Sequence, residues 1–548
     1  MEQKDSFFDG KTLIAIIVVG VIWFSWEKHL QTKYPGAYKK PTPEATVAPV
    51  NAQPAAIISE DKRDKGPPEA KTTAGLKLAP EELVHFEDAN WKFDFSSHGM
   101  GLKNIYLKNM TDRQGHLIRV GEAEKNLPLE TRLYEGTDLL QFRITKKTED
   151  EYIGVAKVQG VEITKSVKIN SALNSFSVTV TATNITASFK GFTTFITDKI
   201  VAPEQKGFFQ RMFFPSYDMP EYYVHAGGKD ERHMFMDDSP FADVIFNQAT
   251  HYSFGSHYFA VAFADQSSIT PTVKLHLDHP TKTFVGTINH QMINPADRFE
   301  IKYAAFAGPK SLDILGSVDP QLKNVVNYGF FGFLSRPMLK IMKGFYNMFN
   351  NWGIAIILLT LMVRLVVLPF NVMSYRSIKA MQTIQPKLKA LQEKYKDNRQ
   401  ELNLATMQLM KEHKVNPLGG CLPMLLQLPV FFALYQVFGQ SIELYKAPFG
   451  LWIHDLSTKD PFYVLPIGMA VTMYIQQKMT PTTMDPQQAK VMMFVPLLFS
   501  LMMLNLPSAL NLYIFVSSLF AVIQQFYFMN DKKNNNGVFL AKAKLAGK

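Results

Sequence analysis

Apolar and polar residues alternate with a period of two from about residue 78 to residue 312. The stretch "VEITKSVKI" places four apolar side chains on one face of a strand: Val161, Ile163, Val167 and Ile169. The stretch "FSVTVTA", residues 176–182, repeats the pattern, and polar turns separate such runs. Many short alternating runs are typical of an antiparallel sandwich or barrel. We therefore predict a large all-β domain over residues 78–320.

The pattern changes to long apolar segments at the two ends of the chain. Six segments are predicted to cross a membrane as helices: 12–26, 352–373, 419–438, 464–479, 491–506 and 509–529. A helix of 16 residues reaches only about 24 Å, and a typical hydrocarbon core is about 30 Å thick. The two shortest segments therefore imply longer helices or a thinned bilayer. The predicted fold class is mixed, a polytopic six-helix membrane protein carrying a β-domain.

The N-terminal apolar segment, "TLIAIIVVGVIWFSW", admits two interpretations. It has the length of a secretory signal, but it ends in bulky aromatic residues instead of a small-residue cleavage site. Tryptophan and other aromatic residues favour membrane interfaces. We interpret residues 1–30 as an uncleaved signal anchor. Residues 31–77, rich in Pro and Ala, then form an extended linker.

Residues 321–350 mix apolar side chains with Arg336, Lys340 and Lys343. This pattern predicts an amphipathic helix in the membrane interface, and the alternative is a helix packed under the β-domain. Residues 351–530 hold five predicted spans, interrupted by residues 375–415. In that interruption, two apolar stripes at helical spacing predict an antiparallel helical hairpin. The stripes consist of Met381, Ile384, Leu388 and Leu391, and of Leu402, Ala405 and Leu409.

Basic residues indicate the orientation of the chain. The predicted hairpin is rich in Lys and Arg, including Lys387, Lys389, Lys394, Lys396 and Arg399, and the tail 531–548 has five lysines. The loop between the third and fourth spans has only Lys446 and Lys459. Because positive loops stay in the cytoplasm, we expect the hairpin and both termini there and the β-domain outside. The hairpin either only sets topology or docks a cytoplasmic partner.

Composition excludes several classes of protein. The net charge is +10, but no zinc-finger spacing, RNA-binding signature or glycine-rich phosphate loop is present, so no nucleic-acid binding is expected beyond a ribosome. The single cysteine, Cys421, cannot form an internal disulfide, which is compatible with a β-domain in a bacterial periplasm. The stretch "HLDH", residues 276–279, lacks a third ligand, so neither a metal nor a cofactor is predicted.

One residue stands out in the second span, "LLTLMVRLVVLPF". Arg364 places a permanent charge in a segment where it costs roughly 2.5–3.5 kcal/mol. It snorkels to the interface, pairs with an acid, or lines a hydrated cavity. Acidic residues near the spans lie in loops, which argues against the pairing. Polar residues on several spans favour a hydrated groove, lined by Arg364, Thr360, Gln427, Gln476, Asn511, Tyr513 and Ser517.

The stretches "VNPLGGCLPMLLQLPVFFALYQVF" and "PSALNLYIFVSSLFAVIQQ" resemble the YidC/Oxa/Alb family of membrane protein insertases, in its Gram-negative form. The resemblance implies a five-helix core with a groove open to cytoplasm and lipid. It also implies a super-sandwich β-domain in the periplasm and a coiled-coil arm at the hairpin. The essential arginine of the family falls on Arg364, the threonine one turn earlier on Thr360, and the functional tyrosine on Tyr513.

The predicted function is therefore that of an insertase and not of an enzyme, in the bacterial inner membrane. Family partners are nascent membrane proteins, membrane lipids and the Sec translocon, with a ribosome or the signal recognition particle receptor as further candidates. No nucleotide-binding motif is present, so client burial and the membrane potential would drive insertion. The alternatives are a small-solute channel or transporter with a periplasmic sensor domain, and an anchored sugar-active enzyme.

Overall fold

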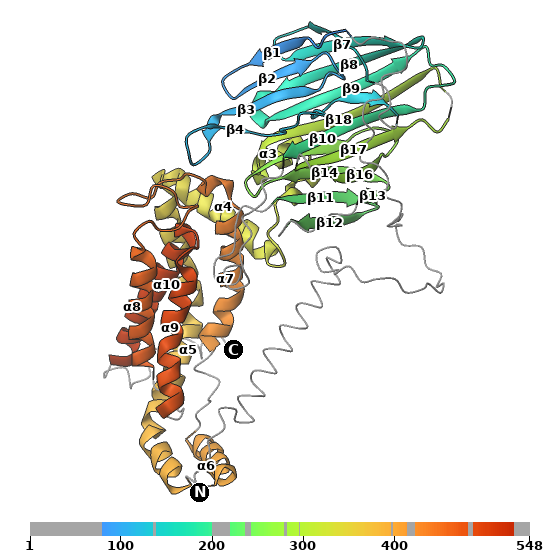
Figure 1. Ribbon diagram of the computed structural model, residues 1–548. Helices are drawn as coiled ribbons and strands as arrows, with labels where there is room; N and C mark the ends of the chain where they lie inside the picture. Colours follow the sequence, from blue (N-terminus) through green and yellow to red (C-terminus); the bar gives the residue numbers. More distant parts are fainter. Residues whose placement is uncertain are drawn as a thin grey trace, which may run out of the picture. The chain divides into compact units, whose positions relative to one another are not determined.

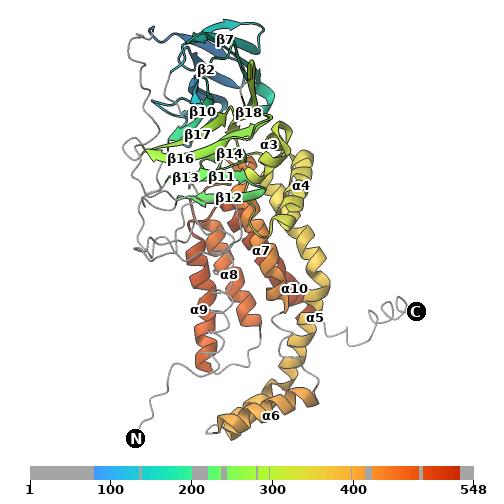
Figure 2. The ribbon, with the colours of Figure 1, turned by 90° about the vertical axis from the view of Figure 1, so that its right-hand side faces the viewer.

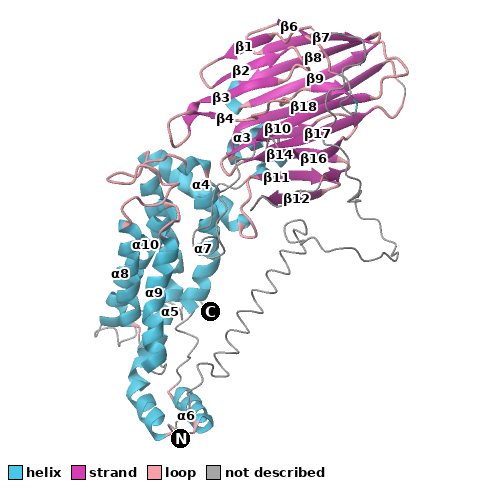
Figure 3. Cartoon of the chain, in the orientation of Figure 1, coloured by secondary structure: helices cyan, strands magenta, loops and turns pink. Residues whose placement is uncertain are grey.

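The computed structural model describes residues 79–134, 139–199, 220–235, 243–278, 282–294, 296–395, 398–413, 422–480 and 486–530. These residues fall into two compact units, one ending at Val326 and one beginning at Asn327. The strands are gathered in the first unit and the long helices in the second (Figure 1, Figure 3). The predicted signal anchor, linker and tail lie outside the described residues.

The first unit contains three antiparallel sheets. The four-stranded sheet has the order β1 (Leu83–Glu87), β2 (Trp91–Ser96), β3 (Leu102–Thr111), β4 (Leu117–Arg119). The five-stranded sheet has the order β13 (Val244–Phe246), β16 (Thr272–Asp278), β17 (Thr283–Gln291), β10 (Gly191–Lys199), β5 (Thr131–Leu133). The nine-stranded sheet has the order β12 (Lys229–Met234), β11 (Glu221–Ala226), β14 (Ala249–Gly255), β15 (Phe259–Asp265), β18 (Arg298–Pro309), β9 (Ser175–Thr183), β8 (Val161–Asn170), β7 (Glu151–Val158), β6 (Arg143–Lys146). A short 3-10 helix, η3 (Ser171–Leu173), joins β8 to β9.

The two smaller sheets cover the same face of the nine-stranded sheet. Trp91 of the four-stranded sheet stacks on Phe176 at 4.6 Å, and Phe284 of the five-stranded sheet stacks on Phe254 at 4.2 Å. The strand register links Phe254 to Phe176 through Val261 on β15 and through β18, without a change of face. The unit is therefore a two-layer sandwich, as the alternating pattern predicts.

The alternation in β8 is confirmed, with one addition. Val161, Ile163, Val167 and Ile169 are all buried on one face. Lys165 occupies the same face and is fully buried. Its ammonium donates to the Met100 carbonyl at 3.0 Å and to Thr131 Oγ1 at 3.0 Å. Burial lowers the pKa of Lys165 to about 7.

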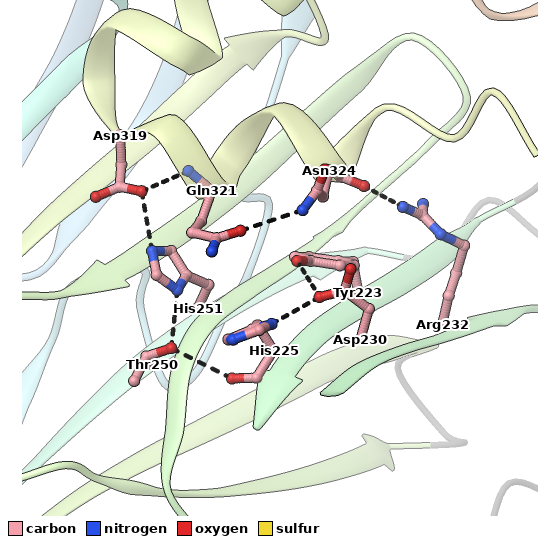
Figure 4. Close-up of polar contacts among 9 residues, drawn as sticks. All are labelled: Tyr223, His225, Asp230, Arg232, Thr250, His251, Asp319, Gln321 and Asn324. Carbon is pink, nitrogen blue, oxygen red and sulfur yellow. Dashed lines mark hydrogen bonds and ion pairs between the residues drawn. The ribbon is translucent and has the colours of Figure 1, made fainter. Parts of the chain in front are cut away.

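The end of the sandwich is tied down by polar contacts (Figure 4). After β18 the chain forms α3 (Leu312–Val318) and the 3-10 helix η4 (Pro320–Val325). His251 on β14 hydrogen-bonds Asp319 at 3.0 Å, at the start of η4. Arg232 on β12 donates to the backbone carbonyls of Asn324 and Val325, at its end. Both ends of η4 are therefore held on the edge of the nine-stranded sheet.

The second unit is helical. It contains α4 (Gly332–Phe349), α5 (Trp352–Lys394), α6 (Arg399–Glu412), α7 (Leu422–Gln440), η6 (Ile442–Leu444), α8 (Val464–Met479), α9 (Pro486–Met503) and α10 (Ser508–Asn530). Helix α10 packs against α5 and α8, and α9 packs mainly on α8. Helix α4 is amphipathic, since Arg336 and Lys340 are exposed while Met338 and Met342 are buried, and its place in a membrane interface stays a prediction.

Helix α5 differs from the prediction in length. The predicted second span ended at residue 373 and a separate hairpin followed, whereas the structure has one helix of 43 residues (Figure 2). Between Met373 and Lys394 the sequence has no glycine, and residues with good helix propensity continue the helix through Pro386. The hairpin is then completed by α6, with Ile384, Leu388 and Leu409 forming its core.

Two helices in the described residues are long and apolar enough to cross a membrane, Trp352–Lys394 and Ser508–Phe528. The other three predicted spans after residue 350 coincide with helices α7, α8 and α9. The count of six spans therefore stays a prediction.

Candidate functional site

Two matched contacts show that α5 and α10 run in the same direction. Arg364 on α5 hydrogen-bonds Ser517 on α10, and Asn371 hydrogen-bonds Gln524. Both members of the second pair lie seven residues further along their helices, which is two helical turns. Parallel helices place their C-terminal ends on the same side. The hairpin, which continues α5, and the C-terminal end of α10 therefore leave this bundle on one side.

Arg364 is the centre of a polar seam, which we define as Arg364, Ser517, Tyr513 and Gln427. The Nε of Arg364 donates to Ser517 Oγ at 2.8 Å, and its Nη2 donates to the same oxygen. A further side-chain hydrogen bond joins Ser517 to Tyr513, one turn earlier on α10. Gln427 Nε2 on α7 donates to the Tyr513 hydroxyl at 2.5 Å. The seam thus connects three helices, α5, α10 and α7.

Among the residues that the structure describes, the charge of the seam has no counter-ion. In the described part of the chain, the hydrogen bonds of the Arg364 side chain go to Ser517, which is neutral. Glu443 pairs with Lys343 at 2.7 Å. Asp460 accepts from the Trp452 indole at 2.9 Å and from backbone N–H groups at the start of α8. Both carboxylates are therefore engaged with other partners.

Two of the predicted groove residues are used elsewhere. Thr360 is buried and donates to the Ile356 carbonyl of its own helix at 2.7 Å. Asn511 is buried and donates to the carbonyls of Met503 and Leu506, at the end of α9. Both side chains satisfy backbone groups, so their hydroxyl and amide N–H groups are not directed to Arg364.

The remaining predicted groove residues divide into two sets. Ser517, Tyr513 and Gln427 are brought together around Arg364. Gln476 is half-buried on α8, and the structure gives its side chain no hydrogen bond to the seam. The whole predicted set remains a functional hypothesis, because contact alone does not show that a residue meets a client.

Three other polar pairs between helices were not among the predicted site residues. They are Asn371 with Gln524 at 3.3 Å, Thr472 with Ser518 at 2.7 Å, and Thr480 with Gln525 at 3.1 Å. Each pair has one member on α10. The other member lies on α5, on α8 or directly after α8. The available signal was spacing, since Ser517 and Gln524 repeat at seven residues and Ser518 and Gln525 do the same.

The hairpin presents its basic residues to solvent. Lys389 and Lys394 are exposed, and Lys387 lies 2.9 Å from His413 at the end of α6. Arg399 begins α6, and Lys396 lies outside the described residues. The apolar side chains Leu404 and Met407 are also exposed on α6.

Comparisons with known proteins agree with this architecture. Residues 118–341 match the family described as YidC periplasmic domain, and residues 344–536 match the family described as 60Kd inner membrane protein. The membrane protein insertase YidC of Citrifermentans bemidjiense is 51% identical over 235 residues, 43% of this chain and 44% of the relative. That of Magnetococcus marinus is 31% identical over 554 residues, 95% of this chain and 98% of the relative.

A crystal structure of an active YidC insertase, with its first transmembrane domain resolved, aligns with 19% identity and a TM-score of 0.37. The alignment covers 82% of this chain and 93% of that chain. The chain spans about half the length of the first curated relatives that it matches.

The two matching family descriptions give the class of protein, an inner membrane protein with a periplasmic domain. The relative from Magnetococcus marinus matches almost end to end. The chain therefore belongs to the YidC family of membrane protein insertases.

Proposed function

We propose that this protein inserts nascent membrane proteins into the bacterial inner membrane, without acting as an enzyme. The observation that carries the proposal is the charge of Arg364, which meets a serine hydroxyl and no carboxylate in the described residues. The relatives that match the chain are named as insertases. No observation favours the alternative of a solute channel or transporter.

The chemistry of the seam suits an acidic client segment. An unpaired cation in a low-dielectric environment attracts a carboxylate strongly, and this attraction offsets part of the cost of desolvating it. Arg364 supplies the charge, while Ser517 and Tyr513 hold hydrogen-bonding groups beside it. The client would rest at this seam only transiently. A membrane potential positive outside then draws a negative segment outward, by about 2.3 kcal/mol per charge for each 100 mV.

Apolar surface is available for the apolar part of a client. Several large side chains of α9 are exposed: Phe494, Val495, Leu497, Leu498 and Leu501. On α5, Leu365 and Val366 are exposed directly after Arg364. Exposed apolar surface of this kind contacts lipid or a client helix. We propose that client helices leave the seam along the groove formed by α5 and α10, and that Thr360, Gln476 and Asn511 line its margins.

We propose six spans, cytoplasmic termini and a periplasmic sandwich as the topology. The parallel arrangement of α5 and α10 supports it, because it puts the basic hairpin and the end of α10 on one side. The five lysines of the tail 531–548 follow α10 in the sequence. Positive charge on that side is what the positive-inside rule requires of the cytoplasm.

The hairpin is the proposed docking arm for cytoplasmic partners. It combines the exposed cations Lys389 and Lys394 with the exposed apolar residues Leu404 and Met407. Such a surface fits a ribosome or the signal recognition particle receptor, and the Sec translocon is proposed as a partner within the membrane. These assignments rest on the family and on surface chemistry.

Site-directed crosslinking tests the proposal most directly. A photoreactive residue replaces Leu365 or Ser517 in the full-length protein, and a stalled nascent chain with an acidic tail is presented in inverted membrane vesicles. We expect crosslinks at both positions that disappear when the chain is released. The matched control is Ile293 of the sandwich, which is 75% exposed. Equal crosslinking at Ile293 and at the seam would contradict the proposed path.

A further inference from the structure

A proline divides α5 close to the seam. Pro369 lies five residues after Arg364 and two residues before Asn371, inside the helix. Proline has no backbone N–H, so the Leu365 carbonyl loses its helical hydrogen bond, and its ring disfavours a straight helix. Such a position is the usual place for a helix to bend. The direction of α5 after Pro369 therefore depends on what holds that part of the helix.

Contacts with α10 hold α5 on both sides of this proline. Before it, Arg364 donates to Ser517 at 2.8 Å. After it, Asn371 Nδ2 donates to Gln524 Oε1 at 3.3 Å. Asn371 is 2% exposed and Gln524 is 6% exposed, so water competes little for this bond.

The amide contact after Pro369 is a single hydrogen bond, although two amide side chains could form two. The Oδ1 atom of Asn371 is buried and has no partner among the described residues. In lipid, apolar contact alone favours helix–helix packing weakly, because lipid chains are as apolar as the side chains. A buried amide pair then has a large influence on which packing is populated. The amide bond holds this part of α5 on α10 together with Tyr375, which stacks on Phe528 at 5.8 Å.

The hairpin lies directly beyond this contact. Helix α5 continues without a break from Asn371 to Ile384 and Leu388, which form the hairpin core with Leu409. Tyr375, one turn after Asn371, donates to the Ala521 carbonyl at 3.4 Å and continues the contact with α10. A change of helix direction at Pro369 would therefore move the whole hairpin relative to α8 and α10.

We propose that Asn371 and Gln524 are positioning residues that form an amide clasp. The clasp keeps the part of α5 after Pro369 packed on α10 and so sets the direction in which the hairpin leaves the bundle. The geometry of the clasp does not depend on the proposed function, but its consequence for insertion rests on that function. Opening of the clasp lets the hairpin swing while Arg364 stays on Ser517.

The test measures distances between spin labels in the full-length protein in lipid nanodiscs, with Cys421 replaced by serine. One label pair joins Leu404 of the hairpin to Val471 of α8, which are 69% and 52% exposed. The reference pair joins Leu365, before Pro369, to Val471. In Asn371→Leu with Gln524→Leu, we expect the Leu404–Val471 distribution to shift, with the ratio of swung to docked hairpins rising about threefold. The Leu365–Val471 distribution should stay unchanged.

Two control variants make the test specific. Thr472→Val with Ser518→Ala removes another buried polar pair of α10, joined at 2.7 Å, and should leave the hairpin in place. Asn371→Gln with Gln524→Asn exchanges the two amides and should restore the docked distribution. An unchanged Leu404–Val471 distribution in the double leucine variant would overturn the clasp. Equal shifts in both label pairs would also overturn it, because they would show general loosening of the bundle.

Insertion of an acidic client by the same variants in nanodiscs separates the two proposals. If the hairpin shifts and insertion slows, the clasp positions the hairpin for the proposed function. If the hairpin shifts and insertion is unchanged, the clasp stands and hairpin direction has no role in insertion. Loss of insertion in every variant, including the Thr472 and Ser518 control whose hairpin stays in place, would contradict a link between hairpin direction and insertion.

Discussion

Two arginines in this molecule have opposite kinds of partner. In the sandwich, Arg232 is 10% exposed and pairs with Glu221 at 3.0 Å, while Lys310 binds the same carboxylate at 2.7 Å. In the helical unit, Arg364 donates to Ser517, which is neutral. Glu221 compensates the charge of Arg232 and holds it in the sandwich. Among the described residues, Arg364 keeps an uncompensated charge in the region where the proposed client would pass.

The difference separates a stabilising ion cluster from a charge for which we propose a function. Burial alone raises the pKa of Glu221, but Lys310 and Arg232 lower it to about 2. The cluster therefore contributes to folding through its favourable charge state. A cation without a counter-ion contributes nothing comparable, and a buried charge of that kind is a cost. The cost of Arg364 is understandable if a client carboxylate compensates it during insertion.

The largest expected effect breaks the ion cluster. Glu221→Gln removes the carboxylate that Arg232 and Lys310 share, and we expect it to destabilise the sandwich by about 3 kcal/mol. Hydrogen exchange of peptides from β11 and β18 in the full-length protein measures this as faster exchange in denaturant. The control is Glu149→Gln, which removes an exposed pair with Lys146 and should leave exchange unchanged. Equal exchange in the Glu221 variant and in the unsubstituted protein would contradict the stabilising role.

Acid should act on the same cluster. Because the pKa of Glu221 is lowered from 4.5 to about 2 in the folded state, its contribution is fully present above pH 4.5. It is lost as the pH falls from 4.5 to about 2, and the total is on the order of 3 kcal/mol. Denaturant titrations at several pH values in this window measure the slope. The slope should be shallower in Glu221→Gln, and an unchanged slope would assign it to other groups.

Giving Arg364 a counter-ion should make the two regions alike. Ser517→Asp places a carboxylate beside the guanidinium, so we expect insertion of an acidic client to slow about tenfold. Purified protein in vesicles and protection of the client from protease measure the rate. Ser517→Asn, which keeps a neutral polar group, is the matched control and should slow insertion much less. A Ser517→Asp protein that inserts at the normal rate would show that the free charge is unimportant.

The smallest expected effect concerns the link from the seam to α7. Tyr513→Phe removes the hydroxyl that accepts from Gln427, and a hydrogen bond between membrane helices contributes about 0.6 kcal/mol on average. We expect insertion to slow about threefold at most. Tyr527→Phe, on the exposed face of the same helix, is the control. A loss as large as that of Ser517→Asp would mean that Tyr513 has a direct role with the client.

Periodicity predicted most of the architecture, and it did so for a physical reason. Strands that bury one face alternate, as β8 and β9 do, and helices of a bundle repeat at three and four residues. The same alternation places Lys165 on the buried face, although its partners, such as the Met100 carbonyl, are distant in sequence.

The continuity of α5 into the hairpin was missed because a change from apolar to polar residues ends a span without ending a helix.

Four of the seven predicted groove residues lie together, and their role with a client stays a prediction. Arg364, Gln427, Tyr513 and Ser517 lie together, because each is a polar residue whose helix face turns inward. Thr360 and Asn511 also turn inward, but nearby backbone carbonyls accept their hydrogen bonds. The acceptors of Asn511 are carbonyls at the end of α9, and where that helix ends is a property of the packed structure.

The central claim is that Arg364 acts through its charge on acidic client segments, and a crossed comparison tests it. Two clients, identical except that the translocated tail carries either aspartates or asparagines, are inserted by the unsubstituted protein and by Arg364→Gln in vesicles containing only this protein. We expect the substitution to slow the aspartate client about tenfold and the asparagine client little, since only the former loses an ion pair. Equal slowing of both clients, at equal protein abundance, would contradict the account.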